Sequence, residues 1–296
     1  MEKVMNLIQM FQRFPDHEAC VEHLEIVRWG DEPYCPYCGS PDVARKDEHG
    51  RIGRWNCHAC KSSFNALSGT IFQKTKIPLQ KWFLAIALIL NAKKSLSSWQ
   101  LSRDLDLNQK SAWFLTMRLR RAMASKEGDL LRGIIEADEC YIGGKPRKGN
   151  KRDDDMPNKR GRGTDKMPVI GAVARGGEVV AEPASKVNSS TLSAFIDRNV
   201  DLPASLLITD ELAGYNAIGK KVRRAVIKHA ERYAEGIVHT NTMEGFWALV
   251  KRAWYGQHHH YSRTYTHLYI TEACYKYNIR NRADQFGDFL QLAFAS

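Results

Sequence analysis

Three short segments, far apart in the sequence, carry side chains that can bind divalent cations. Asp138 follows an apolar pair at 134–135 and Asp210 follows another apolar run at 206–209, so both aspartates are predicted on strands. Glu244 lies in a later segment with helical periodicity. Hard cations prefer oxygen ligands, and two of them can bind the attacking and the leaving oxygen of a phosphodiester. We therefore expect Asp138, Asp210 and Glu244 to hold two catalytic Mg²⁺ or Mn²⁺ ions.

The third ligand has two candidates on one helix face. Asn241 precedes Glu244 by three residues, so it shares the same helix face and offers a neutral carbonyl oxygen to a cation. We keep Asn241 as the alternate third ligand. Lys251 lies two helical turns beyond Glu244 and is expected, with its neighbour Arg252, to bind a phosphate. Four other acidic residues are further candidates: Glu136, Glu139, Glu211 and Glu272. The alternative reading is that Asp138 or Asp210 only caps the turn that follows it.

Four of the seven cysteines are paired at the spacing of a metal site. Cys35 and Cys38 form one CxxC pair, and Cys57 and Cys60 form a second pair after 18 intervening residues. Two such pairs fit a tetrahedral Zn²⁺ bound by four thiolates. Because no coordination position is left for a substrate, we expect this zinc to be structural. The region 1–77 is therefore predicted to contain a zinc ribbon after a short N-terminal helix.

The net charge of +11 is concentrated in one part of the chain. Residues 1–77 hold equal numbers of acidic and basic side chains, whereas residues 78–127 hold nine basic and three acidic ones, a net charge of +6. The latter region has helical patterns at 79–91, 95–105 and 109–124, with a short turn between the last two. This arrangement predicts a helix-turn-helix that binds double-stranded DNA. A plain helical bundle is the alternative. The candidate DNA contacts are Gln109, Lys110, Arg118, Arg120 and Arg121.

The remaining region, 128–296, alternates strand-like and helical segments. Strands are predicted at 133–141, 167–174, 178–182, 205–209 and 223–228, and helices at 189–200, 211–218 and 242–254. This order predicts a multidomain α/β protein with a ribonuclease-H-like catalytic domain on a five-stranded mixed sheet. Its first and fourth strands would be neighbours, which would place Asp138 about 5 Å from Asp210. The strongly basic loop 143–166 is expected to lie along DNA through Lys145, Arg147 and Lys148.

The sequence lacks the features of a membrane or secreted protein. It has no apolar run of 18 residues and no N-terminal cleavage signal. Its odd number of cysteines indicates a reducing compartment, so we expect a cytoplasmic protein.

Several long segments resemble the zinc-ribbon DDE transposases of bacterial and archaeal insertion sequences, which have an ISXO-like DDE domain. The similar segments include EADECYIGGKPRK, ITDELAGY and HTNTMEGFWALVKR in the second half, and CPYCGSPDV and WNCHACKSSFNALSGTIF in the first. The resemblance implies that Asp138 and Asp210 are the catalytic aspartates. It places Glu or Asn at the third position, which corresponds here to Glu244, with Asn241 close by.

The resemblance also implies an activity and its partners. A transposase of this kind would bind terminal inverted repeats and catalyse metal-dependent DNA strand cleavage and strand transfer to target DNA. It would act as a homodimer or higher oligomer on DNA, associated with the nucleoid of a prokaryotic cell. Two alternatives remain open at this point: an inactive DNA-binding regulator derived from a transposase, and a nuclease or resolvase with a ribonuclease-H-like fold.

Overall fold

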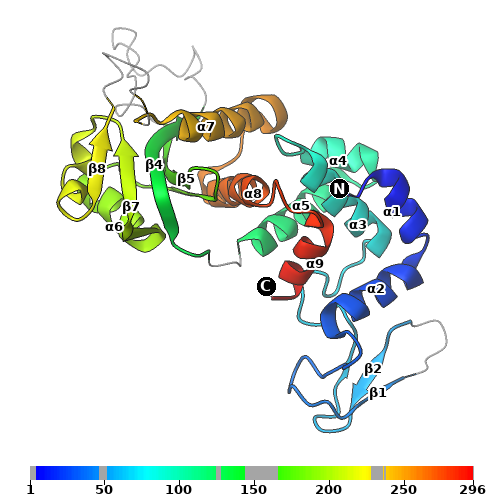
Figure 1. Ribbon diagram of the computed structural model, residues 1–296. Coiled ribbons are helices and arrows are strands. Elements are labelled where there is room, and N and C mark those ends of the chain that lie inside the picture. The colour runs from blue at the N-terminus through cyan, green and yellow to red at the C-terminus, as the bar shows by residue number, and fades with distance from the viewer. Residues whose placement is uncertain are drawn as a thin grey trace. The chain divides into compact units, whose positions relative to one another are not determined.

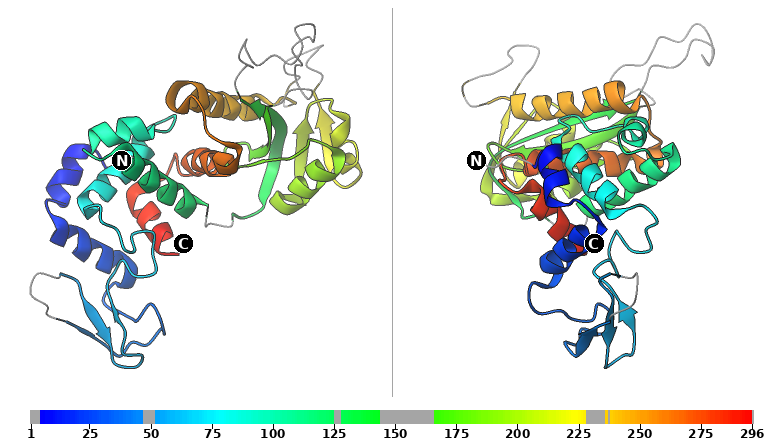
Figure 2. Two further views of the ribbon diagram at one scale, coloured as in Figure 1. Left: turned by 180° about the vertical axis from the view of Figure 1, so that it is seen from behind. Right: turned by 90° about the vertical axis from the view of Figure 1, so that its right-hand side faces the viewer.

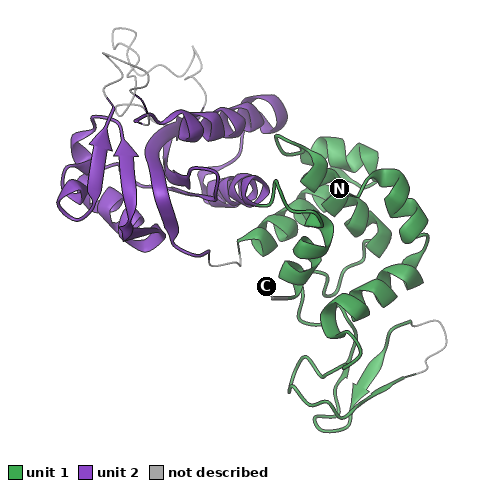
Figure 3. Cartoon of the chain, in the orientation of Figure 1, with its two compact units in different colours: residues 1–126, 279–296 green, residues 127–278 purple. Residues whose placement is uncertain are grey.

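The chain forms two compact units. The computed structural model describes residues 5–46, 52–124, 128–143, 166–227, 236 and 238–295. The first unit comprises residues 1–126 together with 279–296, and the second comprises 127–278 (Figure 3). The chain therefore leaves the first unit and returns to it at the C-terminus. The sequence alone had assigned 279–296 to the catalytic region.

The first unit begins with two helices followed by a small sheet. Helix α1 (Leu7–Arg13) is followed by α2 (His17–Trp29), which starts where the side chain of Asp16 accepts a hydrogen bond from Ala19 N at 2.9 Å. Strands β1 (Val43–Arg45), β2 (Trp55–Cys57) and β3 (Ser63–Phe64) pair antiparallel in that order. This confirms the ribbon predicted around the cysteines.

Three helices follow the ribbon at the predicted places: α3 (Leu79–Asn91), α4 (Ser98–Asp104) and α5 (Gln109–Met123). Ser97 caps α4 by accepting from Gln100 N at 3.1 Å, and Asn108 caps α5 by accepting from Ser111 N at 2.8 Å. Such caps satisfy the free N–H groups of the first helical turn. The turn between α4 and α5 is tight enough to require a positive φ of 47° at Asp106.

Helix α9 (Gln285–Ala295) completes the helical part of the first unit. It packs against α2, α3 and α5, and its residues Phe286, Phe289, Leu290 and Ala293 are buried. The ring of Phe286 lies 5.4 Å from that of Phe83 on α3. Helix α9 therefore belongs to the core of the first unit, although it comes after all of the second unit in the sequence.

The second unit is built on a five-stranded mixed sheet, as predicted. The strands lie in the order β6-β5-β4-β7-β8, so the first and the fourth strands of the unit are neighbours. Strands β4, β5 and β6 pair antiparallel, and β4–β7 and β7–β8 pair parallel. Their bounds are β4 Leu131–Ile142, β5 Met167–Ala174, β6 Val179–Pro183, β7 Val200–Thr209 and β8 Arg223–Val226.

Helices cover both faces of this sheet (Figures 1 and 2). Helix α6 (Ser189–Asn199) packs on one face with Leu192, Phe195 and Ile196, and α7 (Asn241–Ala253) packs on the other with Met243, Phe246 and Trp247. Helix α8 (Thr266–Asn278) lies on the same face as α7 and contacts β6. The end of α7 continues as a π-helical turn at Trp254–His258, and a 3₁₀ turn at Arg263–Tyr265 precedes α8.

Two predicted elements differ from the structure. The helix predicted at 211–218 is replaced by 3₁₀ turns at Ala213–Tyr215 and Ile218–Lys220, because Gly214 and Gly219 weaken a regular helix in so short a segment. Strand β7 begins at Val200 rather than at 205. The polar residues and Pro203 at its start hide that strand pattern, and the register with β4 shifts between Leu131 and Gly133.

Among the described residues, no helix has the length and the apolar composition that crossing a bilayer would need.

Candidate metal centre

Asp138 and Asp210 lie side by side at the end of the parallel pair β4–β7. The register places Glu136 opposite Ile208, and each aspartate follows two residues later. One carboxylate oxygen each from Asp138, Asp210 and Glu139 lie within 4.8 Å of one another. The two aspartates, 72 residues apart in sequence, are therefore brought together by a single strand pairing, as predicted. Asp138 lies inside β4 rather than at its end, because β5 continues to pair with β4 as far as Ile142.

Asp210 is held by its own turn and by an arginine from the neighbouring strand. Its Oδ1 accepts a hydrogen bond from Leu212 N at 3.0 Å, which fixes the turn after β7. Arg224 of β8 donates to the Asp210 carbonyl at 3.0 Å and to Thr209 Oγ1 at 2.9 Å. Its Nη1 also donates to Asn216 at 2.9 Å. Arg224 thus fixes the backbone that presents the Asp210 carboxylate, a role that no local sequence signal indicated.

The electrostatics of the site show uncompensated negative charge. The pKa of Asp138 is raised to about 6, mainly by burial and in part by the charges of Asp210 and Glu244. A backbone hydrogen bond at Glu139 and the charge of Lys251 act in the opposite direction. Burial, together with the same acidic cluster, also raises the pKa of Tyr215. A bound divalent cation would supply the positive charge that this cluster lacks.

Helix α7 contributes Glu244 and Lys251. Both side chains are exposed, and both are near enough to affect the pKa of Asp138. Glu244 Oε1 accepts a hydrogen bond from Thr240 Oγ1 at 3.2 Å. The alternate ligand Asn241 is exposed at the first position of the helix. Glu244 is nevertheless outside the group of three mutually close carboxylates, and its place there is taken by Glu139, which had been only a subsidiary candidate.

The other three subsidiary acidic candidates have different environments. Glu136 is completely buried and forms an ion pair with Arg175 at 2.5 Å. Glu272 is buried on α8 with Lys276 Nζ 3.7 Å away, and Glu211 is exposed. None of these three belongs to the group of close carboxylates among the described residues.

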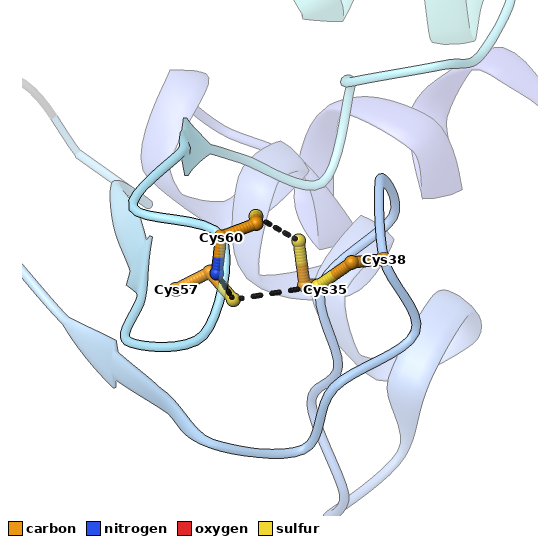
Figure 4. A group of neighbouring side chains, drawn as sticks. All are labelled: Cys35, Cys38, Cys57 and Cys60. Atoms are coloured by element: carbon orange, nitrogen blue, oxygen red, sulfur yellow. Dashed lines mark hydrogen bonds between the residues drawn. The ribbon is translucent and has the colours of Figure 1, made fainter.

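The four paired cysteines form a second candidate metal site, in the ribbon (Figure 4). All four sulfurs lie within 4.8 Å of one another, with 3.7 Å between the sulfurs of Cys35 and Cys60 and 3.6 Å between those of Cys38 and Cys57. Hydrogen bonds from Ser62 lower the pKa of Cys60 to about 6. A backbone hydrogen bond at Ser40 lowers the pKa of Cys38, but burial and hydrogen bonds with the other three cysteines outweigh it and raise that pKa to about 12. A bound cation would favour the thiolate form of all four. Cys20, Cys140 and Cys274 do not belong to this group.

The predicted DNA contacts divide into several environments. Lys110 and Arg121 on α5 and Lys251 and Arg252 on α7 are exposed, and Gln109 is half-buried and donates to Ser98 Oγ at 3.1 Å. Arg118 donates to the backbone carbonyls of Ile71 and Gln73 at 2.8 and 3.2 Å. Arg120 is buried, so the expectation that it contacts DNA is corrected. Lys145, Arg147 and Lys148 lie outside the described residues.

Comparison with known proteins identifies the class to which this sheet, carboxylate cluster and ribbon belong. Residues 130–278 match the ISXO2-like transposase domain, and residues 15–63 match the transposase zinc-ribbon domain. The chain therefore belongs to the ISXO2-like family of transposases. A protein of the transposable element ISH50 of Halobacterium salinarum, described as uncharacterized, is 30% identical over 257 residues, which are 83% of this chain and 85% of that protein.

Similarity to solved structures is much weaker. A pre-cleavage Mos1 transpososome matches with 11% identity over 72% of this chain and 78% of that chain, with a TM-score of 0.27. A Mos1 strand transfer complex matches with 10% identity over 70% of this chain and 73% of that chain, with a TM-score of 0.29. Scores this low carry no argument about this chain. The assignment to the transposases depends on the family matches and the Halobacterium salinarum relative.

Proposed function

We propose that this transposase binds the terminal inverted repeats of its element and catalyses metal-dependent DNA cleavage and strand transfer with Asp138, Asp210 and Glu244. The observation that carries this proposal is the parallel pairing of β4 and β7, which gathers Asp138 and Asp210 at one edge of a sheet. It is supported by the transposase family, whose domain match covers the segments that carry all three residues. We also assign the domain to the ribonuclease-H-like class, whose strand order it shares.

The residues present fit divalent cations. Asp138, Asp210 and Glu139 offer close carboxylate oxygens, and Glu244 adds a fourth acidic group nearby. Oxygen donors of this kind suit Mg²⁺ and Mn²⁺ better than softer metals. When bound, two such ions supply Lewis-acid chemistry to the oxygens of a phosphodiester. We keep Glu244 as the third ligand, with Asn241 as the alternate, and add Glu139 as a further candidate.

The side chains around the carboxylates have supporting roles in this proposal. Arg224 keeps the Asp210 backbone in place, so that its carboxylate stays beside Asp138. Lys251 carries a positive charge near Asp138 and, with Arg252, would bind a DNA phosphate beside the reacting bond. No covalent enzyme intermediate is required, because water and then a DNA 3′-hydroxyl can act as the nucleophiles.

DNA recognition would come from the first unit. We propose that α4 and α5 act as a helix-turn-helix, with Gln109, Lys110 and Arg121 at the DNA, and that the four cysteines bind a structural Zn²⁺. The functional regions 1–77, 78–127 and 128–296 are kept in this proposal, except that α9 belongs to the core of the first unit. Because two element ends must be joined, we expect a homodimer or higher oligomer acting on the DNA of a prokaryotic nucleoid.

A cleavage and joining assay tests the proposed function. The full chain is incubated with labelled double-stranded DNA that carries the element's terminal repeat, a target plasmid, and Mg²⁺ or Mn²⁺. We expect cleavage and joined products, both of which Asp210→Asn abolishes while the affinity for the repeat persists. Ser190→Ala, an exposed position in the first turn of α6, is the control variant and should behave as wild type.

The other outcomes of this assay separate the alternatives. Binding of the repeat without any metal-dependent cleavage by the wild-type chain would indicate a regulator derived from a transposase. Cleavage without joining to target DNA would instead indicate a nuclease or resolvase. Either result overturns the proposed function.

A further inference from the structure

Glu136 is a charged residue in the interior of the second unit that the proposed chemistry does not use. It lies on β4 two residues before Asp138, and because side chains alternate along a strand, both point to the face covered by α7. Its exposure is 0%. A carboxylate in such a position is costly unless it is paired and hydrogen-bonded. Its partners therefore indicate what it does.

The Glu136 carboxylate caps helix α7. Its Oε2 accepts hydrogen bonds from Thr242 N at 2.8 Å and from Met243 N at 3.0 Å, and its Oε1 accepts from Thr242 Oγ1 at 2.9 Å. Thr242 and Met243 are the second and third residues of α7, whose N–H groups a residue just before the helix usually satisfies. Within the described residues, the Thr240 side chain makes no such cap. Glu136, a strand residue 106 positions before Thr242, replaces it.

Arg175 fixes this cap from the other side. It follows β5, where its backbone N–H donates to Ile134 O at 3.0 Å. Its Nε donates to Glu136 Oε1 at 2.5 Å, and its Nη2 donates to the carbonyl oxygen of His239 at 2.9 Å and lies 2.9 Å from Nδ1 of the same residue. One arginine thus connects β4, β5 and the segment that leads into α7. His239 is part of this structural contact.

The cap determines where α7 begins relative to Asp138. Glu244 follows Met243 directly, and its N–H donates to Thr240 O at 2.9 Å in the first turn of the helix. The backbone that carries Glu244 is therefore bound to β4 at Glu136, and Asp138 lies on the same strand two residues further on. A shift of the first turn would move Glu244 away from the two aspartates.

We propose that Glu136, together with Arg175 and Thr242, is a positioning residue that fixes the start of α7 and thereby holds Glu244 at the metal site. This inference depends on the proposed function, because it assumes that Glu244 contributes to binding the cations. Residues that orient metal ligands typically change metal affinity by about 10- to 100-fold when they are replaced. We therefore expect a tenfold or larger effect from loss of the cap.

The test measures Mn²⁺ binding to the full chain by electron paramagnetic resonance, with amide hydrogen exchange and DNA cleavage measured in parallel. Glu136→Gln keeps the size of the side chain but removes its charge. The NH₂ group of the new amide cannot accept a hydrogen bond from the N–H groups of α7. We expect the Mn²⁺ concentration at half-saturation to rise about tenfold. The Thr242 and Met243 amides should exchange faster, while affinity for the terminal repeat stays unchanged.

A matched pair at Thr242 covers the case in which Glu136→Gln does not fold. Thr242→Val removes the hydroxyl that donates to Glu136, whereas Thr242→Ser keeps it. We expect weaker Mn²⁺ binding in the valine variant and wild-type binding in the serine variant. If Glu136→Gln does not fold, the Thr242 pair decides the question. Equal Mn²⁺ affinities of the valine and serine variants would then overturn the inference.

A double variant tests whether Glu136 acts through Glu244. If it does, adding Glu136→Gln to Glu244→Gln should weaken Mn²⁺ binding no further than Glu244→Gln alone. Full additivity would overturn the inference, as would a Glu136→Gln protein with wild-type Mn²⁺ affinity. In both cases an active wild-type chain leaves the proposed function intact. A wild-type chain that neither binds Mn²⁺ nor cleaves DNA refutes the proposed function itself, and the inference with it.

Discussion

Gly171 of β5 lies directly opposite Asp138 of β4 in the antiparallel pair. A Cβ atom at this glycine would contact the end of Met243 and would lie 2.9 Å from the ring of Trp247. Both of these residues belong to the buried face of α7. The missing side chain therefore lets α7 approach the sheet beside Asp138, at the place where Glu244 has to reach the metal site.

Gly171→Ala should push α7 away from the sheet. We expect a loss of about 1–3 kcal/mol in the free energy of unfolding, the usual cost of overpacking a core. Strand transfer should fall further than this loss of stability explains, because Glu244 moves with the helix. Urea denaturation and the joining assay measure the two effects. Gly245→Ala on the same helix meets open space and is the control, with unchanged or slightly higher stability. Wild-type stability of Gly171→Ala would contradict the close contact.

Asp138→Asn should stabilise the metal-free protein at alkaline pH. The folded state raises the pKa of Asp138 from 3.8 to about 6, mainly by burial, so the folded protein binds this proton more tightly than the unfolded chain does. The favourable contribution is complete below pH 3.8 and is lost as the pH rises through about 6. At pH 8 in a chelator we expect a gain of about 1–3 kcal/mol for the asparagine variant.

Thermal unfolding of both proteins between pH 4 and 8 measures this gain. The difference between wild type and Asp138→Asn should shrink steadily below pH 6. A less stable asparagine variant at pH 8 would show that the carboxylate is already compensated in the metal-free protein. The proposed need for a cation at this cluster would then lose its electrostatic support.

The arginines of α5 should separate into a structural and a DNA-binding type. Arg118 donates to two backbone carbonyls near Phe72, so Arg118→Ala should lower stability by about 1–3 kcal/mol. Arg121 is exposed, so Arg121→Ala should leave stability unchanged and reduce the salt dependence of DNA binding by about one unit of slope. Binding titrations at several salt concentrations, with denaturation curves, distinguish the two. The reverse assignment of effects would refute the environments described for these side chains.

Helix α9 should be necessary for the DNA-binding unit to fold. Phe289 is completely buried, and we expect Phe289→Ala to cost about 3–5 kcal/mol in the unfolding of the first unit. Gln291→Ala, on the exposed side of the same helix, should change stability by less than about 0.5 kcal/mol. A fragment of residues 1–126 should be poorly folded alone and should gain helical structure when a peptide of residues 279–296 is added. A stable, DNA-binding fragment without that peptide would count against this prediction.

Local sequence patterns determined the elements and the types of site. The cysteine spacing predicted the ribbon, because two CxxC pairs can bring four sulfurs to one point. Helical periodicity predicted α4 and α5, since this signal acts within a few residues. The apolar runs before Asp138 and Asp210 predicted the strands, and the order of elements along the chain predicted that these two strands are neighbours, which brings the two aspartates together.

Tertiary structure alone decided which side chains are available for chemistry and which ones hold the fold. Glu136 and Asp138 are similar in sequence context, yet one caps α7 and the other lies in the carboxylate cluster. Arg120 and Arg121 are adjacent, yet one is buried and the other exposed. Helix α9 joins a core formed by residues more than 150 positions away. These differences arise because burial and long-range hydrogen bonds depend on neighbours that the fold supplies, and a local pattern cannot contain them.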